Sequence, residues 1–134
     1  MKFNTAVSSQ ADKVRKAFFT ATKDAKHVAM SAPLSKETRE TYSVKALPIR
    51  RGDEVRVVRG KYQDREGAVT AVKLSTMRIE VENVSTEKVT TQQVSVPIHP
   101  SNVVITKVKM DKHRNELIER KRAGRKAVLA KLGK

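Results

Sequence analysis

The sequence predicts a mainly β protein: a small antiparallel barrel with a basic, partly helical extension at each end. Three observations favour this fold. Short segments with alternating apolar residues fill the middle of the chain, turn residues separate them at regular spacing, and most of the net positive charge lies outside them. We therefore expect a basic N-terminal extension at 1–47, a barrel at 48–107 and a basic helical C-terminal extension at 108–134.

Five short strands are expected in the barrel, at 53–59, 68–73, 78–84, 94–98 and 103–108. In the first, Val55 and Val57 fall on one face, which is the period-two pattern of a half-buried strand. The third alternates more cleanly, with Ile79 and Val81 on one face. Pro100 marks a turn before the last strand, because proline cannot donate to a central ladder. Five such strands are typical of a small antiparallel barrel.

Two short helices are expected in the N-terminal extension. The first spans about 10–22, where apolar residues recur at helical spacing, and Ser9 with Asp12 resembles a capping box at its start. Ser35 is expected to cap a second helix that ends at Tyr42.

A longer helix is expected in the C-terminal extension. Asp111 is expected to be the N-cap of a helix that runs to about Lys131. Its apolar stripe is thin, and Gly124 weakens its middle by about 1 kcal/mol. We expect this helix to depend on a binding partner for its stability.

The charge of the chain indicates a polyanionic partner. The 134 residues include 29 Lys and Arg against 14 Asp and Glu, so the formal net charge is +15. The three expected parts have net charges of +5, +3 and +7 in chain order. A surface this positive is normally neutralised by a polyanion, of which nucleic acid is the commonest. We expect both extensions to be disordered without RNA and to become ordered on it.

Composition argues against several other functions. Apolar residues make up 38% of the chain and Trp is absent, so one small core is expected and a large catalytic domain is not. The absence of Cys excludes disulfides and thiol chemistry. The three histidines, His27, His99 and His113, are too far apart for a local metal pair, so no metal and no cofactor is expected. No phosphate-binding loop or nucleophile elbow is present, and an enzyme is the weakest class. We find no membrane-spanning run or signal peptide and expect a soluble intracellular protein.

The segments 49–62 and 66–69 form the most informative motif. Gly60 and Gly67 bound a loop between two expected strands, and glycine permits both positive φ and close approach of another backbone. The loop offers two cations and one ring for phosphates, bases or sugars: Lys61, Arg65 and Tyr62. From the glycine spacing alone, an ordinary polar hairpin loop is an equally good interpretation.

Segments along the whole chain favour the functional interpretation. This motif resembles the KOW motif, and similar blocks occur at 1–4, 30–37, 48–53, 98–103 and 119–121. In this order they are similar to the universal KOW ribosomal protein family of the large subunit, numbered twenty-four in bacteria and twenty-six in eukaryotes. The opening Met-Lys-Phe-Asn and the two long extensions resemble the eukaryotic form.

The resemblance implies a fold, a function and a location. Members have an SH3-like barrel and are structural constituents of the large ribosomal subunit that bind ribosomal RNA during assembly. They lie near the polypeptide exit tunnel. The implied partners are large-subunit ribosomal RNA, neighbouring ribosomal proteins and nascent-chain factors such as the signal recognition particle. The implied form is one monomer within a cytoplasmic ribosome, transiently nuclear or nucleolar during assembly, with no membrane insertion.

The resemblance also implies which residues face RNA. They are the basic residues of both extensions, the KOW loop and the later turn: Lys13, Arg15, Lys16, Lys23, Lys26, Lys36, Arg39, Arg50, Arg51, Arg59, Lys61, Tyr62, His99, Ser101, Asn102, Lys109, Lys112, Arg114, Arg120 and Lys121. The motif glycines are Gly52, Gly60 and Gly67. Lys131 and Lys134 end a basic tail that nascent-chain factors or lysine-modifying enzymes would reach.

Two features depart from the family pattern. Asp64 stands where the family usually has glycine, and we expect Asp to adopt the left-handed conformation there at modest cost. The basic run after the first helix is diluted by Thr22, Asp24 and Ala25, so we expect residues 20–27 to follow RNA less closely than in the family pattern.

A KOW regulatory factor that binds RNA polymerase or messenger RNA is the alternative function. Isolated KOW motifs also occur in transcription elongation factors, so the motif alone does not separate the two classes. A ribosomal protein is expected at one copy per large subunit, whereas a regulator is expected to be substoichiometric.

Overall fold

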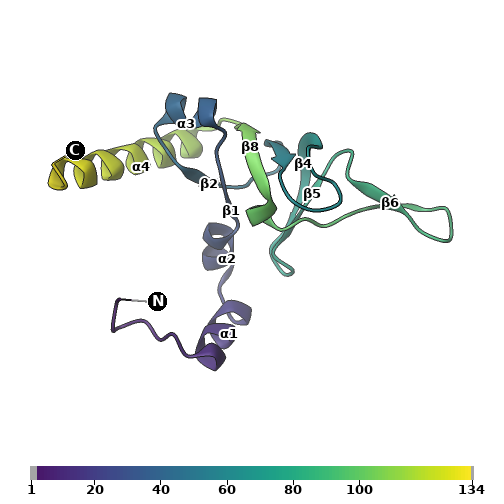
Figure 1. Cartoon of the computed structure of the whole chain (residues 1–134), viewed down its shortest axis with the longest axis horizontal. Helices are drawn as coiled ribbons and strands as arrows, with labels where there is room; N and C mark the ends of the chain where they lie inside the picture. The colour runs from purple at the N-terminus through teal and green to yellow at the C-terminus, as the bar shows by residue number, and fades with distance from the viewer. Residues whose placement is uncertain (1–2, 134) are drawn as a thin grey trace.

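The computed structural model describes residues 3–133. Figure 1 shows a β body from which helix α4 (Lys112–Lys131) extends on one side and a β-hairpin on the other, while the N-terminal helices extend below it. Met1 and Lys2 of the opening motif, and Lys134 at the end of the basic tail, lie outside the described residues.

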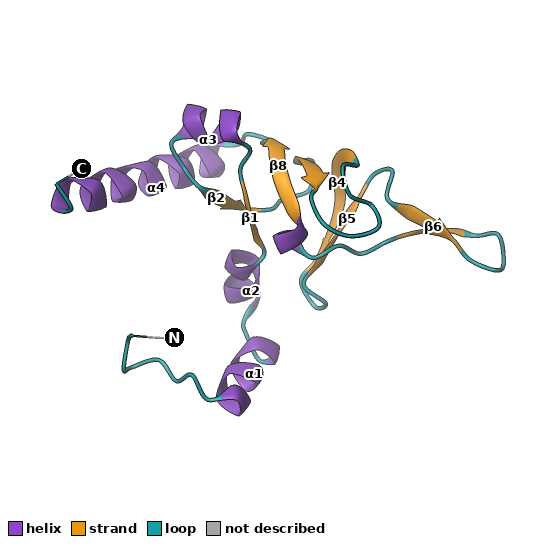
Figure 2. Cartoon of the chain, in the orientation of Figure 1, coloured by secondary structure: helices purple, strands orange, loops and turns teal. Residues whose placement is uncertain are grey.

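A four-stranded antiparallel sheet forms the centre of the body, as Figure 2 shows in orange. Its strands lie in the order β5 (Arg78–Val81), β4 (Glu66–Lys73), β3 (Glu54–Val57) and β8 (Val103–Lys107). Four of the five expected strands are therefore confirmed, and the arrangement agrees with a small KOW or SH3-like fold. Val55 lies between Gly67 on one neighbouring strand and Ile105 on the other.

The expected closure into a barrel is wrong, because the sheet stays open. The segment predicted as the fourth strand, 94–98, splits into two parts. Its first part is β7 (Gln93–Ser95), which pairs with β6 (Ser85–Glu87) in a separate hairpin. Its end contacts the sheet through a single bridge, in which Ile98 and Ile79 exchange backbone hydrogen bonds of 2.8 Å. Strand β6 is exposed at every position, so it has no apolar face to pack on the body.

Two short strands form within the predicted N-terminal extension. Strand β1 (Ser31–Pro33) pairs with β2 (Ala46–Pro48), and helix α3 (Lys36–Tyr42) connects them. Leu34 bridges to Ile105 of β8, so this unit packs directly on the sheet. Neither strand was expected, since three residues ending in proline show no usable alternation.

Local capping rules explain most helix boundaries. Ser35 caps α3 by accepting from the Thr38 backbone N–H at 3.3 Å, as expected. Asp111 caps α4 by accepting from the Arg114 backbone N–H at 2.7 Å, also as expected. This bond lowers the pKa of Asp111, and the charge of Arg50 lowers it further.

The N-terminal helices differ from expectation at their ends. Helix α1 (Ala11–Phe19) begins after Gln10, which makes no side-chain cap bond, so the predicted capping by Ser9 is wrong. The helix ends before Thr20, and Thr22 then caps an unpredicted helix, α2 (Lys23–Ala29), by accepting from the Ala25 N–H at 3.4 Å.

The buried core extends past both predicted boundaries of the barrel. Its apolar residues run from Met30 to Ile118 and include Ala32, Leu34, Val44 and Leu47 from the predicted N-terminal extension. Within residues 3–133, no residue before Met30 or after Ile118 is buried. Residues 30–47 and the first turns of α4 therefore belong to the packed body.

A buried ion pair fixes α4 to the sheet. The Arg114 side chain is 1% exposed and the Asp53 side chain 0%, and two bonds of 2.7 and 2.8 Å join them. Asp53 also accepts from the backbone N–H groups of Arg50 and Lys109, each at 2.9 Å. Arg114 donates to the Pro48 carbonyl at 3.1 Å. The pair is thus surrounded by hydrogen bonds, as a buried charge requires.

Candidate nucleic-acid interface

The KOW loop connects β3 to β4 with the backbone geometry that its sequence predicts. Gly60 has φ of 99° and Asp64 has φ of 62°, so Asp64 adopts the expected left-handed conformation. The loop closes through hydrogen bonds from the Asp64 N–H to the Val57 carbonyl, 2.8 Å, and from the Val57 N–H to the Arg65 carbonyl, 2.9 Å. These two bonds close the loop at its base, between Val57 and residues 64–65.

Gly67 allows β4 to approach the end of β5 closely. A Cβ atom at this position would lie 2.6 Å from the Glu82 carbonyl oxygen. The expected need for glycine at this end of the loop is confirmed. Gly52 meets a different constraint, because its φ is 91° and its neighbour is the flexible Lys109 side chain.

The ring of Tyr62 is flanked by cations of its own loop. The Arg65 guanidinium lies 5.1 Å from the ring centroid and the Lys61 ammonium lies 6.0 Å from it. Tyr62 is half-buried and packs against the core. Arg65 is fixed further by a bond to the Asn83 carbonyl at 2.8 Å. The loop therefore presents exposed cations, including Arg59, more readily than an open ring face.

The turn at 99–102 lies beside the KOW loop. His99 caps a short 3₁₀ helix, η1 (Pro100–Asn102): its Nδ1 accepts from the Ser101 N–H at 3.2 Å and lies 2.7 Å from the Ser101 hydroxyl. Burial, with the nearby charge of Arg78, lowers the pKa of His99. The Asn102 carbonyl accepts from the Val58 N–H at 2.8 Å. This bond joins two segments that are far apart in sequence.

We call the residues that these two segments present the loop cluster: Arg59, Lys61, Ser101 and Asn102. All belong to the predicted RNA-facing set. Arg59, Lys61 and Ser101 are exposed and Asn102 is half-buried.

Arg50 and Arg51 occupy different environments although they are adjacent. Arg50 is half-buried and forms an ion pair with Asp111 at the start of α4. It lines a hollow between α2 and α4 together with His27 and Arg120. Arg51 is exposed and makes no ion pair within the described residues.

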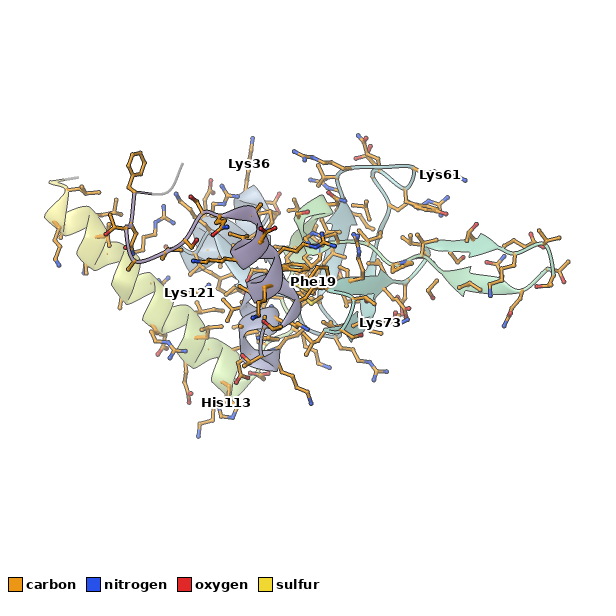
Figure 3. All side chains as sticks on the ribbon, turned by 90° about the horizontal axis from the view of Figure 1, so that it is seen from below. Phe19, Lys36, Lys61, Lys73, His113 and Lys121 are labelled. Atoms are coloured by element: carbon orange, nitrogen blue, oxygen red, sulfur yellow. The ribbon has the colours of Figure 1, made fainter. Side chains whose placement is uncertain are left out.

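A second basic surface lies between α3 and α4. We call it the α3–α4 groove, and its cationic lining consists of Arg39, Arg122, Arg125 and Lys126. Arg122 and Arg125 donate to the carbonyls of Thr41 and Ser43, at 3.4 and 3.1 Å. These bonds hold the guanidinium groups in place and leave their charge without a carboxylate partner. Figure 3 shows Lys121, on the same helix, far from Lys61 of the loop cluster.

Sequence reasoning missed three residues of this groove: Arg122, Arg125 and Lys126. A usable pattern is present, because positions 122, 125 and 126 share one face of a helix at i, i+3 and i+4. In addition, α4 contains no Asp or Glu after Glu119.

The remaining predicted residues are scattered over the surface, with one exception. Exposed cations are Lys13, Arg15 and Lys16 on α1, Lys23 on α2, Lys36 and Arg39 on α3, Lys109 before α4, and Lys112, Arg120 and Lys121 on α4, whereas Lys26 is half-buried. Arg114 is the exception. The prediction that it faces RNA is wrong, because its guanidinium is buried against Asp53.

Carboxylates neutralise a different set of cations, which lies on the sheet. Arg56 pairs with Glu66 at 3.9 Å, Lys107 with Glu54 at 2.9 Å, and Lys73 with Glu80. Within residues 3–133, no carboxylate pairs with the cations of the loop cluster or of the α3–α4 groove. These two surfaces and the N-terminal helices are therefore among the parts of residues 3–133 whose positive charge no carboxylate neutralises.

Residues 3–133 were also compared with what a metal site and a membrane-spanning helix require. No three His, Cys, Asp or Glu side chains there are grouped so that they could hold a metal ion. None of the helices in that range is long and apolar enough to cross a membrane.

The open sheet, the KOW loop and the two basic surfaces define the class: a small KOW protein with a surface suited to polyanions. Comparison with known proteins then identifies the family. Over residues 8–121 the chain matches the ribosomal protein family described as L26 in eukaryotes and as the L24 type in archaea. It belongs to this ribosomal protein family, which confirms the resemblance found in the sequence.

Individual relatives cover most of the chain. The large ribosomal subunit protein uL24A of Saccharomyces cerevisiae is 50% identical over 115 residues, which is 86% of this chain and 91% of that protein. The uL24 protein of Candida albicans is 49% identical over 120 residues, 90% of this chain and 94% of that protein. The uL24 protein of Caenorhabditis elegans is 44% identical over 128 residues, 96% of this chain and 90% of that protein.

Proposed function

We propose that this chain is a structural, RNA-binding constituent of the large ribosomal subunit. The observation that supports this most strongly is the unneutralised charge of the loop cluster and the α3–α4 groove, on a fold whose relatives are named as large ribosomal subunit proteins. Cations without carboxylate partners are the groups that release counterions when they bind phosphates.

The two basic surfaces suit different parts of an RNA. The loop cluster combines cations with the hydroxyl of Ser101 and the amide of Asn102, which can contact sugars and base edges. The charged lining of the α3–α4 groove has four cations against the one carboxylate of Glu40, so it suits the phosphate backbone. Arg114 acts indirectly, because its ion pair with Asp53 sets the direction in which α4 leaves the sheet.

Several finer features of this function rest on family membership. They are binding to ribosomal RNA during assembly, a position near the polypeptide exit tunnel, contacts with neighbouring ribosomal proteins, and a nuclear or nucleolar stage before the cytoplasmic ribosome. The exposed C-terminal turns of α4, which contain Lys131, are available to nascent-chain factors in this arrangement.

The alternative, a KOW regulator of RNA polymerase or messenger RNA, finds no support in the comparisons. The relatives named above are ribosomal proteins, and their similarity extends well beyond the KOW segment at 49–69. The family is structural rather than catalytic.

Sedimentation of the tagged protein from cell extracts tests the proposed function. We expect one copy per large subunit, retained after a high-salt wash, because many phosphate contacts act together. A substoichiometric amount that washes off would instead identify a transient regulator.

A further inference from the structure

Helix α1 exposes an aromatic pair that no other part of the described chain covers. The Phe18 side chain is 48% exposed and the Phe19 side chain 60%. Their ring centroids lie 5.3 Å apart, with an angle of 88° between the ring planes. No residue of α1 is buried, and Figure 1 shows the helix below the β body, joined to it through α2.

The chain has few aromatic residues, and its phenylalanines are the exposed ones, with Phe3 89% exposed in addition to the pair on α1. It contains two Tyr and three Phe and no Trp. Both tyrosines, Tyr42 and Tyr62, pack against the core. Two adjacent rings left in water lack the stabilisation that the tyrosines gain from burial. We therefore expect a partner outside the chain to cover the pair.

The surroundings of the pair are cationic. The Arg15 guanidinium lies 5.1 Å from the centroid of the Phe19 ring. Lys13 and Lys16 are on the same helix, and Asp12 is its one carboxylate. An apolar pocket in a protein would have to accept these cations as well, whereas RNA supplies phosphates beside aromatic bases.

Within RNA, the exposed rings favour unpaired bases over a duplex. Bases in a helix are covered on both faces by their stacked neighbours, so their π-faces are not available to a side chain. A base in a loop or bulge has a free face, and stacking on aromatic residues is a common way to bind it.

We propose that α1 is a site for unpaired RNA nucleotides, in which one ring of the Phe18–Phe19 pair stacks on a base and the other packs against the edge of that base, while Arg15 and Lys16 contact the adjoining phosphates. The inference rests on the proposed RNA-binding function and specifies its substrate as single-stranded RNA. It gives the first helix a role different from that of the two basic surfaces, because stacking depends less on salt than phosphate contacts do.

The lack of Trp in the chain provides a direct test. A Phe19→Trp variant contains a single Trp, and a base stacked on its indole quenches its fluorescence. We expect quenching by single-stranded oligoadenylate, and none by a fully paired RNA duplex of equal phosphate number or by inorganic polyphosphate. A Val89→Trp variant is the matched control, because Val89 is fully exposed on the distant hairpin; its fluorescence is expected to stay constant.

A second variant measures the contribution of the rings to affinity. Phe18→Leu/Phe19→Leu keeps good helix formers at two exposed positions, so folding is preserved. We expect about tenfold weaker binding to oligoadenylate, with an unchanged salt slope and unchanged binding to duplex RNA. A Lys13→Gln/Lys16→Gln variant is expected to reduce the salt slope instead.

Several results would overturn the inference. Bound oligoadenylate without quenching of Phe19→Trp, or unchanged affinity of the double Leu variant, would show that the rings do not stack on bases, while the proposed RNA-binding function would stand. Loss of the double Leu variant from large subunits, with its oligoadenylate affinity intact, would assign α1 to a protein neighbour. Failure of the wild-type chain to bind any RNA would instead contradict the proposed function itself.

Discussion

Arg114 has a different role in the structure from the one that its place in the sequence predicts. In the sequence it is one of many cations in a basic segment, whereas in the structure it is 1% exposed and bonded to Asp53. The pairing partner lies 61 positions earlier in the chain, so no local rule identifies it. Rules with a short range did succeed, as the caps Ser35 and Asp111 show, because an N-cap bonds within three residues.

Removing one member of the buried pair is expected to destabilise the protein strongly. Arg114→Met leaves the Asp53 carboxylate buried without a cation, and we expect a loss of about 3–5 kcal/mol in the free energy of unfolding. The double variant Arg114→Met/Asp53→Asn removes the uncompensated charge and is expected to recover much of that loss. Urea unfolding measures both.

The control for this experiment is Lys107→Met, which removes the cation of an exposed pair with Glu54. We expect little change in its unfolding midpoint, since surface pairs contribute little. If the double variant were no more stable than Arg114→Met, the destabilisation would not arise from a buried charge.

His99 is expected to make stability depend on pH. Burial, followed by the charge of Arg78, lowers its pKa, and its Nδ1 must be unprotonated to accept from the Ser101 N–H. Because the pKa is lower in the folded state than in the unfolded state, the stabilising contribution is complete above the unfolded pKa of about 6.5. It is lost as pH falls through that value and on through the lower folded pKa.

A comparison with His99→Asn isolates this effect. Asn still accepts a cap bond but does not titrate. Between about pH 7.5 and about pH 5.5, the urea midpoint of the wild type is expected to fall more than that of the variant. His27 and His113 are present in both proteins and cancel in the comparison. Parallel pH profiles would refute the role of His99.

At the scale of elements, strands with a longer alternating pattern were predicted from the sequence, and the shortest strands were not. Strands β3, β4, β5 and β8 have four or more residues with one face on the core, and all four were predicted. Strands β1 and β2 have three residues each and are held by their fit to the sheet, which the sequence does not reveal. The segment 94–98 was predicted to be a strand of the barrel, yet its first half pairs within an exposed hairpin.

Two glycines are expected to respond to Ala in opposite ways. A Cβ at Gly67 would meet the Glu82 carbonyl at 2.6 Å, so Gly67→Ala is expected to destabilise the sheet by about 1–3 kcal/mol. Gly124 lies in α4, and a methyl group there would have no neighbouring atom within 4 Å, so Gly124→Ala is expected to stabilise the helix by about 0.5–1 kcal/mol. Urea unfolding and far-ultraviolet circular dichroism measure the two changes. Equal stability of Gly67→Ala and wild type would refute the close approach of β5.

At the scale of the whole molecule, the packed body is larger than the sequence indicated. Residues 30–47 were expected to lie in a disordered extension because they are basic and poor in large apolar residues, but Met30, Leu34 and Leu47 are buried in the core. Charge describes the surface of such a segment and does not exclude a few well-placed apolar residues. At the two ends of the described chain, α1, α2 and the last turns of α4 lie outside this body and have no buried residues.

Limited trypsin digestion of the free protein tests this larger body. The resistant region is expected to run from about residue 30 to about residue 120, rather than from 46 to 109 as the sequence alone suggests, because burial protects backbone from cleavage. Early cuts are expected on α1 and in the last turns of α4. A resistant fragment that begins near residue 46 would contradict the packing of β1 and α3 on the sheet.

The central claim is that RNA is held by cations which the protein does not neutralise itself. The salt dependence of binding to large-subunit ribosomal RNA tests it most directly, in two triple variants with equal loss of charge. Arg122→Gln/Arg125→Gln/Lys126→Gln removes cations of the α3–α4 groove, and Arg56→Gln/Lys73→Gln/Lys107→Gln removes cations that pair with carboxylates on the sheet. We predict that the groove variant lowers the slope of log affinity against log salt by about 2–3, and the sheet variant by less than about 1. Equal changes in the two slopes would show that RNA binding depends only on the net charge of the chain, and this result would contradict the central claim.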